Sequence, residues 1–269
     1  MNTPPRYVLG SDAPEIDRLD RQAAAISLPT RLLMQTAGIG PGMRVLDVGS
    51  GLGHVAELAA GLVGSEGSVL GVDQDERLLG VAASRSAANV AFVAGDARSF
   101  RDPDPFDALV MRLLLFHLPD AVDVMRHQIE ALRPGGLVVA VDYDLGSIRC
   151  EPAVGLVDTA RGWVEDAFRS AQANPRIGPA LAGILREVGF AGVQTLGIQV
   201  YFQPDDPHGC AMLAAVVRTL APQIIAQGIA TEAQLGLGSF EERLRQQVAA
   251  ARAVVLVPTV VGAWGRRPA

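Results

Sequence analysis

The stretch that decides the fold is V-L-D-V-G-S-G-L-G, which runs from Val45 to Gly53. Apart from Asp47, its first four residues are apolar, and glycine then occupies every second position from Gly49 onward. This order predicts a strand that passes through a tight turn into a helix beginning near His54. Glycine permits such a turn and lets a ligand approach the backbone without a Cβ in the way. The stretch therefore predicts a nucleotide-binding turn.

On either side of this turn, short apolar runs alternate with amphipathic stretches. Such alternation predicts parallel strands joined by crossover helices. Five runs bounded by Gly, Asp or Pro are expected as strands, at 44–48, 68–72, 90–94, 106–111 and 137–141. Two later runs, at 192–202 and 253–264, are expected to complete the sheet. The predicted fold class is α/β, a Rossmann-like, seven-stranded, mostly parallel sheet flanked by helices.

A helix is expected between the fourth and fifth strands, beginning after Pro119. Apolar residues from Val122 to Leu132 recur on one helical face. The Pro-Gly-Gly sequence at 134–136 is typical of a helix end, so the fifth strand is predicted to start after it.

Segments outside the alternation are also predicted to be helical. Asp12 can cap a helix over 13–25, and Pro29 is expected to start a second. The stretch 205–250 is helical in composition and nearly uncharged over much of its length, so it either packs on the sheet or forms a lid over an apolar substrate. The expected division is a single domain over 1–269: an N-terminal helical segment at 1–40, a core at 41–204 and 251–269, and a helical insertion between the last two strands at 205–250.

The amino-acid composition argues against several classes of function. The 269 residues include 49% hydrophobic and 19% charged residues, as in an ordinary globular protein. A net charge of -6 without any basic run argues against nucleic acid as a partner. Cys150 and Cys210 have no metal-ligand spacing, and no run of about 20 apolar residues predicts a membrane span. We expect a cytoplasmic protein that acts on a small molecule. The sequence does not indicate its oligomeric state.

Asp73 narrows the choice of nucleotide. It ends the second predicted strand, at the separation from the glycine turn where an acid accepts both ribose hydroxyls. A dinucleotide fingerprint would place a third glycine at position 54, where this chain has His54. The spacing therefore counts against a nicotinamide cofactor.

The pattern D-x-G-x-G-x-G at Asp47 to Gly53 resembles the first motif of class I S-adenosylmethionine-dependent methyltransferases. Four more stretches are similar to that family's later motifs, in the family's order: Val72 to Asp75, Gly95 to Ala97, Phe106 to Leu118, and Leu132 to Gly136. The resemblance covers residues 43–141 well, the last strand moderately and the apolar insertion hardly at all.

The resemblance implies S-adenosylmethionine as the cofactor and methyl transfer to a small, apolar metabolite. It implies that Asp73 holds the ribose, that Gln74 lies by the adenine and that Asp96 accepts from the adenine amino group. Asp47 either contacts the methionine end or only hydrogen-bonds the glycine turn. The full expected cofactor-binding set is Tyr7, Gln22, Asp47, Gly49, Ser50, Gly51, Gly53, Asp73, Gln74, Gly95, Asp96, Ala97 and Arg112.

Three more members of this set have a second interpretation. The opening residues resemble a methyltransferase subset in which a leading helix closes over the cofactor, with Gln22 facing the methionyl group and Tyr7 the reactive side. They equally fit a capped surface helix. Arg112 ends the fourth strand, where open α/β sheets bind ligands, so it either lines the methionine pocket or pairs with a nearby acid.

Methyl transfer from a sulfonium is an in-line displacement, so the protein has mainly to bind, align and exclude water. His117 follows the fourth strand and is the candidate general base, since an imidazole can titrate near neutral pH; the alternative is a packing role. Asp142 and Tyr143 follow the fifth strand and are expected to overlook the acceptor. No metal is expected, because the nearby acids Asp142 and Asp144 lack a third ligand.

Three other functions remain open at this point. An enzyme of the same fold can bind this cofactor and catalyse a cyclisation or rearrangement, because fold and cofactor loop do not fix the reaction. The others are a nicotinamide-dependent oxidoreductase, which His54 disfavours, and a noncatalytic binding module.

Overall fold

The chain forms two compact units, and the computed structural model describes residues 13–269. The first unit comprises residues up to Asp142 together with Gly178–Leu196 and Val260–Ala269. The second comprises Tyr143–Ile177 and Gly197–Thr259. The stretch 205–250, predicted as a helical insertion, lies within this second unit.

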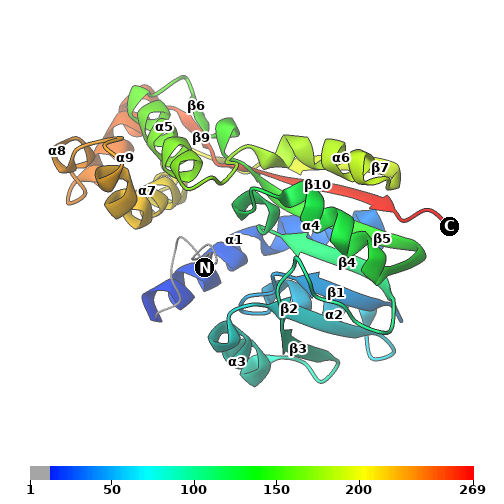
Figure 1. Ribbon diagram of the computed structural model, residues 1–269. Helices are drawn as coiled ribbons and strands as arrows, with labels where there is room; N and C mark the ends of the chain where they lie inside the picture. The colour runs from blue at the N-terminus through cyan, green and yellow to red at the C-terminus, as the bar shows by residue number, and fades with distance from the viewer. Residues whose placement is uncertain (1–12) are drawn as a thin grey trace. The chain divides into compact units, whose positions relative to one another are not determined.

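A seven-stranded sheet organises the first unit (Figure 1). Its order is β3-β2-β1-β4-β5-β10-β7, and the pairs from β3 to β5 are parallel. The amide of Gly135, early in β5, donates to the carbonyl of Arg267, just after β10, and the Arg267 amide donates back to the carbonyl of Gly136, an exchange typical of antiparallel strands. This confirms the Rossmann-like α/β class. The strands are β1 (Arg44–Val48), β2 (Ser68–Asp73), β3 (Val90–Ala94), β4 (Phe106–Arg112), β5 (Leu132–Asp144), β7 (Ala191–Ile198) and β10 (Thr259–Arg266).

The strand register brings the segments after β1, β2 and β4 to one edge of the sheet. Val48 at the end of β1 pairs with Val72 of β2 and with Met111 of β4. Because the three strands are parallel and in step, the glycine turn, Asp73 and Arg112 all lie at this carboxyl edge.

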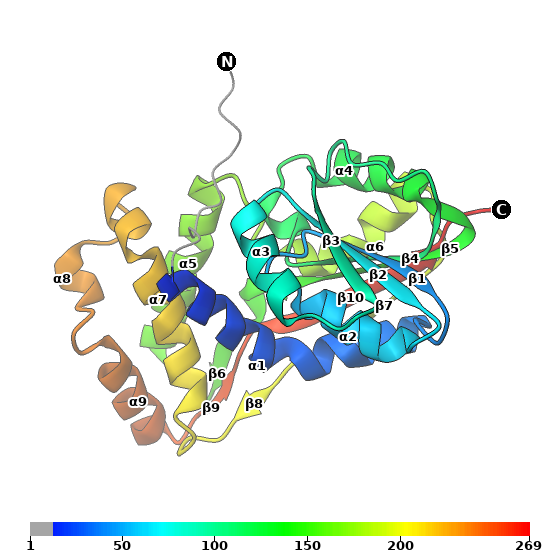
Figure 2. The same ribbon diagram turned by 90° about the horizontal axis from the view of Figure 1, so that it is seen from below.

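Helices pack around this sheet, and Figure 2 shows α1 running beside α2. The core between them is apolar: Leu46, Leu109 and Val139 of the central strands are at most 1% exposed. The elements of the first unit are α1 (Ala13–Ala37), α2 (His54–Val63), α3 (Glu76–Arg85), α4 (Ala121–Gln128), α6 (Ile177–Val188) and the 3-10 turns η1 (Leu115–His117) and η2 (Ile129–Ala131).

The prediction of two N-terminal helices was wrong, because α1 is one helix with Pro29 inside it. Proline removes one backbone donor and disfavours a helix interior. Here Ile26, Leu33 and Met34, on both sides of Pro29, are nearly fully buried. Burial of this apolar face keeps the helix continuous through the proline.

The predicted end of α4 was also wrong. The helix stops at Gln128, and β5 begins at Leu132, so the Pro-Gly-Gly sequence lies inside the strand and not at a helix end. The strand tolerates this sequence at an irregularity: Phe106 pairs with Leu132, but Ala108 pairs with Leu137. A proline is compatible with a strand at such a break in register.

Each of the last two predicted strands is in fact two strands. The run 192–202 divides into β7 and β8 (Tyr201–Phe202), and the run 253–264 into β9 (Val254–Leu256) and β10. The Gln199 side chain, between β7 and β8, donates to the carbonyls of Ser147 and Val257 at 3.1 and 2.9 Å. Pro258 separates β9 from β10, because proline cannot donate to a ladder.

The second unit combines a small sheet with helices. β9 pairs antiparallel with β6 (Arg149–Glu151) and β8. Its other elements are η3 (Leu145–Ser147), α5 (Gly155–Ser170), α7 (His208–Ala226), α8 (Glu232–Leu235) and α9 (Phe240–Ala251). Among residues 13–269, α7 alone is long and apolar enough to cross a membrane; its buried face packs against α5 and α9 instead, as in a core helix.

Close packing of α1 on β10 generates the first prediction. A Cβ at Gly262 would lie 2.7 Å from a methyl carbon of the buried Leu33. We expect Gly262→Ala to destabilise the protein by about 1–3 kcal/mol through overpacking, measured as a lower urea midpoint.

The matched control is Gly61→Ala in α2, where a Cβ meets nothing within 4 Å. Alanine there should be neutral or stabilising by about 0.5–1 kcal/mol, because it favours helix more than glycine. Equal midpoints for the two variants would contradict the packing argument.

Candidate functional site

The glycine turn after β1 has the conformation that its sequence predicts. Gly49, Gly51 and Gly53 have φ values of 76°, 50° and 78°, a region that other residues rarely adopt. A Cβ at position 53 would lie 2.7 Å from the Phe92 ring, so this glycine allows β3 to approach. A Cβ at position 51 would meet nothing within 4 Å. The backbone at Gly51 is therefore open to a ligand.

Asp73 at the end of β2 holds this turn in place. One carboxylate oxygen accepts from the Gly51 amide at 2.8 Å, and the other accepts from the Asp75 amide at 2.9 Å. The side chain is half-buried. Each carboxylate oxygen can accept more than one hydrogen bond, so Asp73 can order the turn and still accept from ligand hydroxyls.

The residues after β3 continue the same edge. The Gly95 amide donates to the Asp73 carbonyl at 2.9 Å, which joins the two strand ends. Asp96 accepts from the Arg98 amide at 2.8 Å, and its side chain stays partly exposed, as do Gln74 and Ala97. The structure thus brings these predicted residues to the turn.

Asp47 is buried in β1 in an unusual environment. It is 1% exposed, and within the described part of the chain neither carboxylate oxygen has a hydrogen-bond partner. Burial raises its pKa to about 7; the Arg112 charge and the Ala56 amide oppose this, and the Asp73 charge adds to it. The hydroxyl of Ser50 is likewise buried without a partner among these residues. Two orphaned polar groups therefore lie beside the turn.

Arg112 at the end of β4 supplies positive charge to this region. Its guanidinium donates to the Thr30 hydroxyl of α1 at 3.5 Å, and Thr30 in turn donates to the Ile26 carbonyl at 2.7 Å. The charge lowers the pKa of both Asp47 and His54. Arg112 thus lies near the other predicted residues, and its hydrogen bond to Thr30 connects it to α1.

His117 lies in η1, which follows β4. Its ring packs edge-on against Phe116, with ring centres 4.7 Å apart. Burial, and then the charge of Arg18 on α1, lower its pKa to about 4. With this pKa the imidazole is neutral near pH 7 and does not titrate there, in contrast to the expectation from the sequence.

Asp142 and Tyr143 have different surroundings. Asp142 is 1% exposed and accepts from the Phe116 amide at 3.0 Å, so it positions the turn that carries His117. Its expected place beside the acceptor stays a prediction. Tyr143 is half-buried and belongs to the second unit.

Sequence reasoning missed several charged residues at this edge. Arg18 donates to the predicted Gln22 at 3.0 Å and acts on His117. Asp20 of α1 contacts His54 at 2.6 Å and Arg85 at 3.1 Å. These partners lie 34 and 65 residues away in sequence, so no local pattern could have revealed them. The predicted Tyr7 lies outside the described residues.

Comparison with known families identifies the class of protein. The family model for the methyltransferase domain matches residues 39–173, which contain the glycine turn, Asp73, Asp96 and His117. The chain belongs to this methyltransferase family.

Individual relatives agree with that assignment. A 2-phytyl-1,4-naphtoquinone methyltransferase from Synechococcus elongatus is 36% identical over 138 residues, which are 48% of this chain and 59% of the relative. A ubiquinone/menaquinone biosynthesis C-methyltransferase from Cellvibrio japonicus is 28% identical over 185 residues, 61% of this chain and 73% of the relative. The chain thus spans a little over half of the first relative's length.

Solved structures share the fold at low sequence identity. The YcgJ protein of Bacillus subtilis is 18% identical with a TM-score of 0.57, over 89% of this chain and 98% of its own. Phosphoethanolamine N-methyltransferase 2 of Haemonchus contortus, in complex with S-adenosylhomocysteine, is 21% identical with a TM-score of 0.56. The match covers 93% of this chain and 53% of the Haemonchus chain.

The buried carboxyl of Asp47 generates the second prediction. The folded protein holds this proton up to about pH 7, whereas the unfolded chain releases it near the ordinary aspartate pKa of 3.8. The contribution of Asp47 to stability should therefore fall as pH rises between these values, and it is isolated as the difference between the wild type and Asp47→Asn, because the lowered pKa of His117 contributes in the opposite direction. Between about pH 5 and about pH 8 the loss is on the order of 3 kcal/mol, because one pKa unit corresponds to about 1.4 kcal/mol. We expect Asp47→Asn to remove this loss in urea unfolding at the two pH values.

Asp123→Asn is the control, since that side chain is 76% exposed on α4. It should leave the pH dependence of the wild type intact. The same slope in Asp47→Asn as in the wild type would show that Asp47 is ionised throughout.

Proposed function

We propose that the chain is an S-adenosylmethionine-dependent methyltransferase that acts on a small, apolar metabolite. The observation that carries this proposal is the hydrogen bond from the Gly51 amide to the Asp73 carboxylate. It joins the open glycine turn to the strand-end acid in the geometry of an adenosine site. The family match over these residues supports the same cofactor.

The residues present fit this cofactor. Asp73 would hold the ribose, with Gln74 and Asp96 at the adenine. The orphaned Asp47 and Ser50 lie where the polar methionine end would supply partners, with Arg112 nearby. A buried polar group without a partner is costly, so a ligand that pairs with Asp47 and Ser50 is favoured.

The chemistry makes modest demands on the chain. When bound, the cofactor supplies an electrophilic methyl group on a positively charged sulfur. The chain's residues then have to bind, align the acceptor at about 3–3.5 Å and exclude water. The glycine turn and α1 serve binding, and the rigid link from Asp142 to η1 fixes the position of His117.

The relatives guide the choice of acceptor. The two named above are, by name, quinone or naphtoquinone methyltransferases, which supports an apolar acceptor. We extend the proposal to a secondary metabolite as acceptor and to action in the cytoplasm without a membrane or nucleic-acid partner, in keeping with the net charge of -6.

His117 is proposed to face the acceptor as a weak base. Its low pKa keeps it neutral, and so able to take up a proton, at physiological pH. Base strength falls with pKa, so it suits an acceptor that loses its proton readily.

Asp73 provides the third prediction. We expect Asp73→Asn to weaken S-adenosylmethionine binding roughly 5- to 150-fold, because charge-assisted hydrogen bonds contribute about 1–3 kcal/mol. The dissociation constant would be measured by titration calorimetry.

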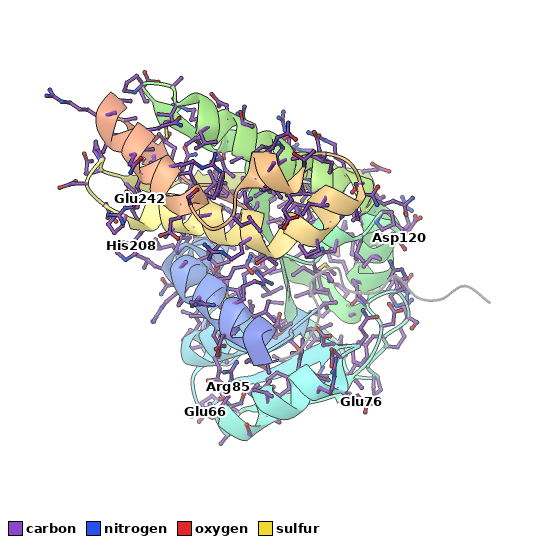
Figure 3. The ribbon with its side chains drawn as sticks, turned by 90° about the vertical axis from the view of Figure 1, so that its left-hand side faces the viewer. Glu66, Glu76, Arg85, Asp120, His208 and Glu242 are labelled. Carbon is purple, nitrogen blue, oxygen red and sulfur yellow. The ribbon has the colours of Figure 1, made fainter. Side chains whose placement is uncertain are left out.

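Glu76→Gln is the matched control, since this exposed acid lies only three residues further on, at the start of α3 (Figure 3). It should bind like the wild type. An unchanged dissociation constant for Asp73→Asn would refute the assignment, and a wild-type protein without affinity for S-adenosylmethionine would refute the proposed function.

His117 provides the fourth prediction. We expect His117→Ala to lower kcat by about 10²-fold, the lower end of general-base effects, while the cofactor dissociation constant stays unchanged. In the wild type, the rate attributable to this base should be level from about pH 6 to about pH 8, because its pKa near 4 lies below that range. Full activity of the variant would remove His117 as the base.

A further inference from the structure

Helix α1 runs beside α2 and contacts residues near the carboxyl edge of the sheet at more than one point along its length. Near its start, Arg18 acts on His117. One helical turn later, Gln22 accepts from Arg18 at 3.0 Å, and further on Thr30 accepts from Arg112. α1 therefore carries Gln22 of the proposed site and contacts Arg112.

Asp20 makes the contacts that fasten this helix to the glycine turn. One of its oxygens lies 2.6 Å from Nε2 of His54, the first residue of α2, and 3.1 Å from a guanidinium nitrogen of Arg85. The same nitrogen of Arg85 donates to the carbonyl of Leu52 at 3.0 Å, inside the glycine turn. Figure 3 shows Arg85 at the end of α3 next to α1.

We propose that Asp20, His54 and Arg85 form a latch that holds α1 across the glycine turn and so slows the departure of the cofactor. Asp20 acts as a positioning residue, through its two partners, and contacts neither cofactor nor acceptor. This inference rests on the proposed function for its ligand, but the latch itself is a property of the ligand-free protein.

The composition of the latch suits a helix that has to open. Its side chains are partly exposed: 38% for Asp20, 27% for His54 and 37% for Arg85. Ion pairs with this exposure are weak and are screened by salt. Because one carboxylate serves two partners, a single side-chain motion would release both. The latch can therefore open without unfolding the sheet beneath it.

The latch also explains His54, which occupies the position where a dinucleotide fingerprint has glycine. Burial lowers its pKa, and the charges of Arg112 and Arg85 lower it further, against the effect of Asp20. A neutral imidazole can donate from Nε2 to Asp20, so the contact does not need a charged histidine. Arg85 then supplies the charge of the latch.

Hydrogen exchange in the ligand-free protein tests the latch directly. We expect Asp20→Ala to speed amide exchange over 17–25 of α1 about three- to tenfold, as for loss of a weak ionic network. Alanine is the better helix former, so propensity alone would slow exchange. Amides of β1 and β4 should be unchanged, which shows that the variant is folded. Unchanged or slower exchange in α1 would overturn the latch.

Two comparisons make the test specific. Asp17→Ala, at an exposed position on the same helix, should leave α1 exchange no faster than in the wild type. Raising NaCl from about 0.05 M to about 1 M should speed exchange in the wild type but not in Asp20→Ala, because screening weakens only an intact ionic latch. Equal salt effects in both proteins would contradict the proposal.

The cofactor supplies the functional readout. The dissociation rate of S-adenosylhomocysteine, measured by stopped-flow competition, should rise about three- to tenfold in Asp20→Ala, and Arg85→Ala in that background should add little further. A wild-type protein that does not bind this ligand would refute the proposed function, while the exchange experiment would still decide the latch. Unchanged release together with faster exchange would show that α1 does not retain the cofactor.

Discussion

The parallel register of β1, β2 and β4 is the constraint on which the site depends. Because Val48 pairs with both Val72 and Met111, the residues that follow these strands meet at one edge without further adjustment. The Asp73 carboxylate then converts this proximity into a defined turn by accepting from the Gly51 and Asp75 amides. Asp73 thus orders the backbone of the glycine turn and the backbone that follows β2. Moving β2 by one residue would point this carboxylate to the other face of the sheet.

The elements that could be predicted from sequence are those whose ends are marked by local chemistry. The bounds of β1 and β3 were confirmed at 44–48 and 90–94, because each is a short apolar run with a sharp break on both sides. Predictions failed where distant contacts override a local signal. Pro29 does not end α1, because buried residues flank it, and the Pro-Gly-Gly sequence before 137 lies in a strand because β4 and β10 pair with that strand.

The same distinction applies to the site. The glycine turn and Asp73 could be recognised because strand, turn and acid follow one another at fixed spacing. Asp20 and Arg85 could not, since they meet from helices 65 residues apart and each has the composition of an ordinary solvated position. The contact made by Asp142 could not be predicted either: its carboxylate is buried and accepts from the Phe116 amide. Its role depends on a backbone donor that no sequence pattern identifies.

Two kinds of electrostatic design therefore coexist at one edge of the sheet. Asp47 is fully enclosed, and because this burial raises its pKa to about 7, the folded protein keeps it partly protonated at neutral pH. Asp20, by contrast, is partly exposed and fully engaged, so solvent can replace its partners when α1 moves. An enclosed, unsatisfied acid favours a cationic ligand that pairs with it, whereas a weak, exposed network makes the covering helix easy to release. Under the proposed function, the first property contributes affinity and the second contributes exchange, which is the combination that a turnover cycle requires, because a spent cofactor has to leave after each reaction.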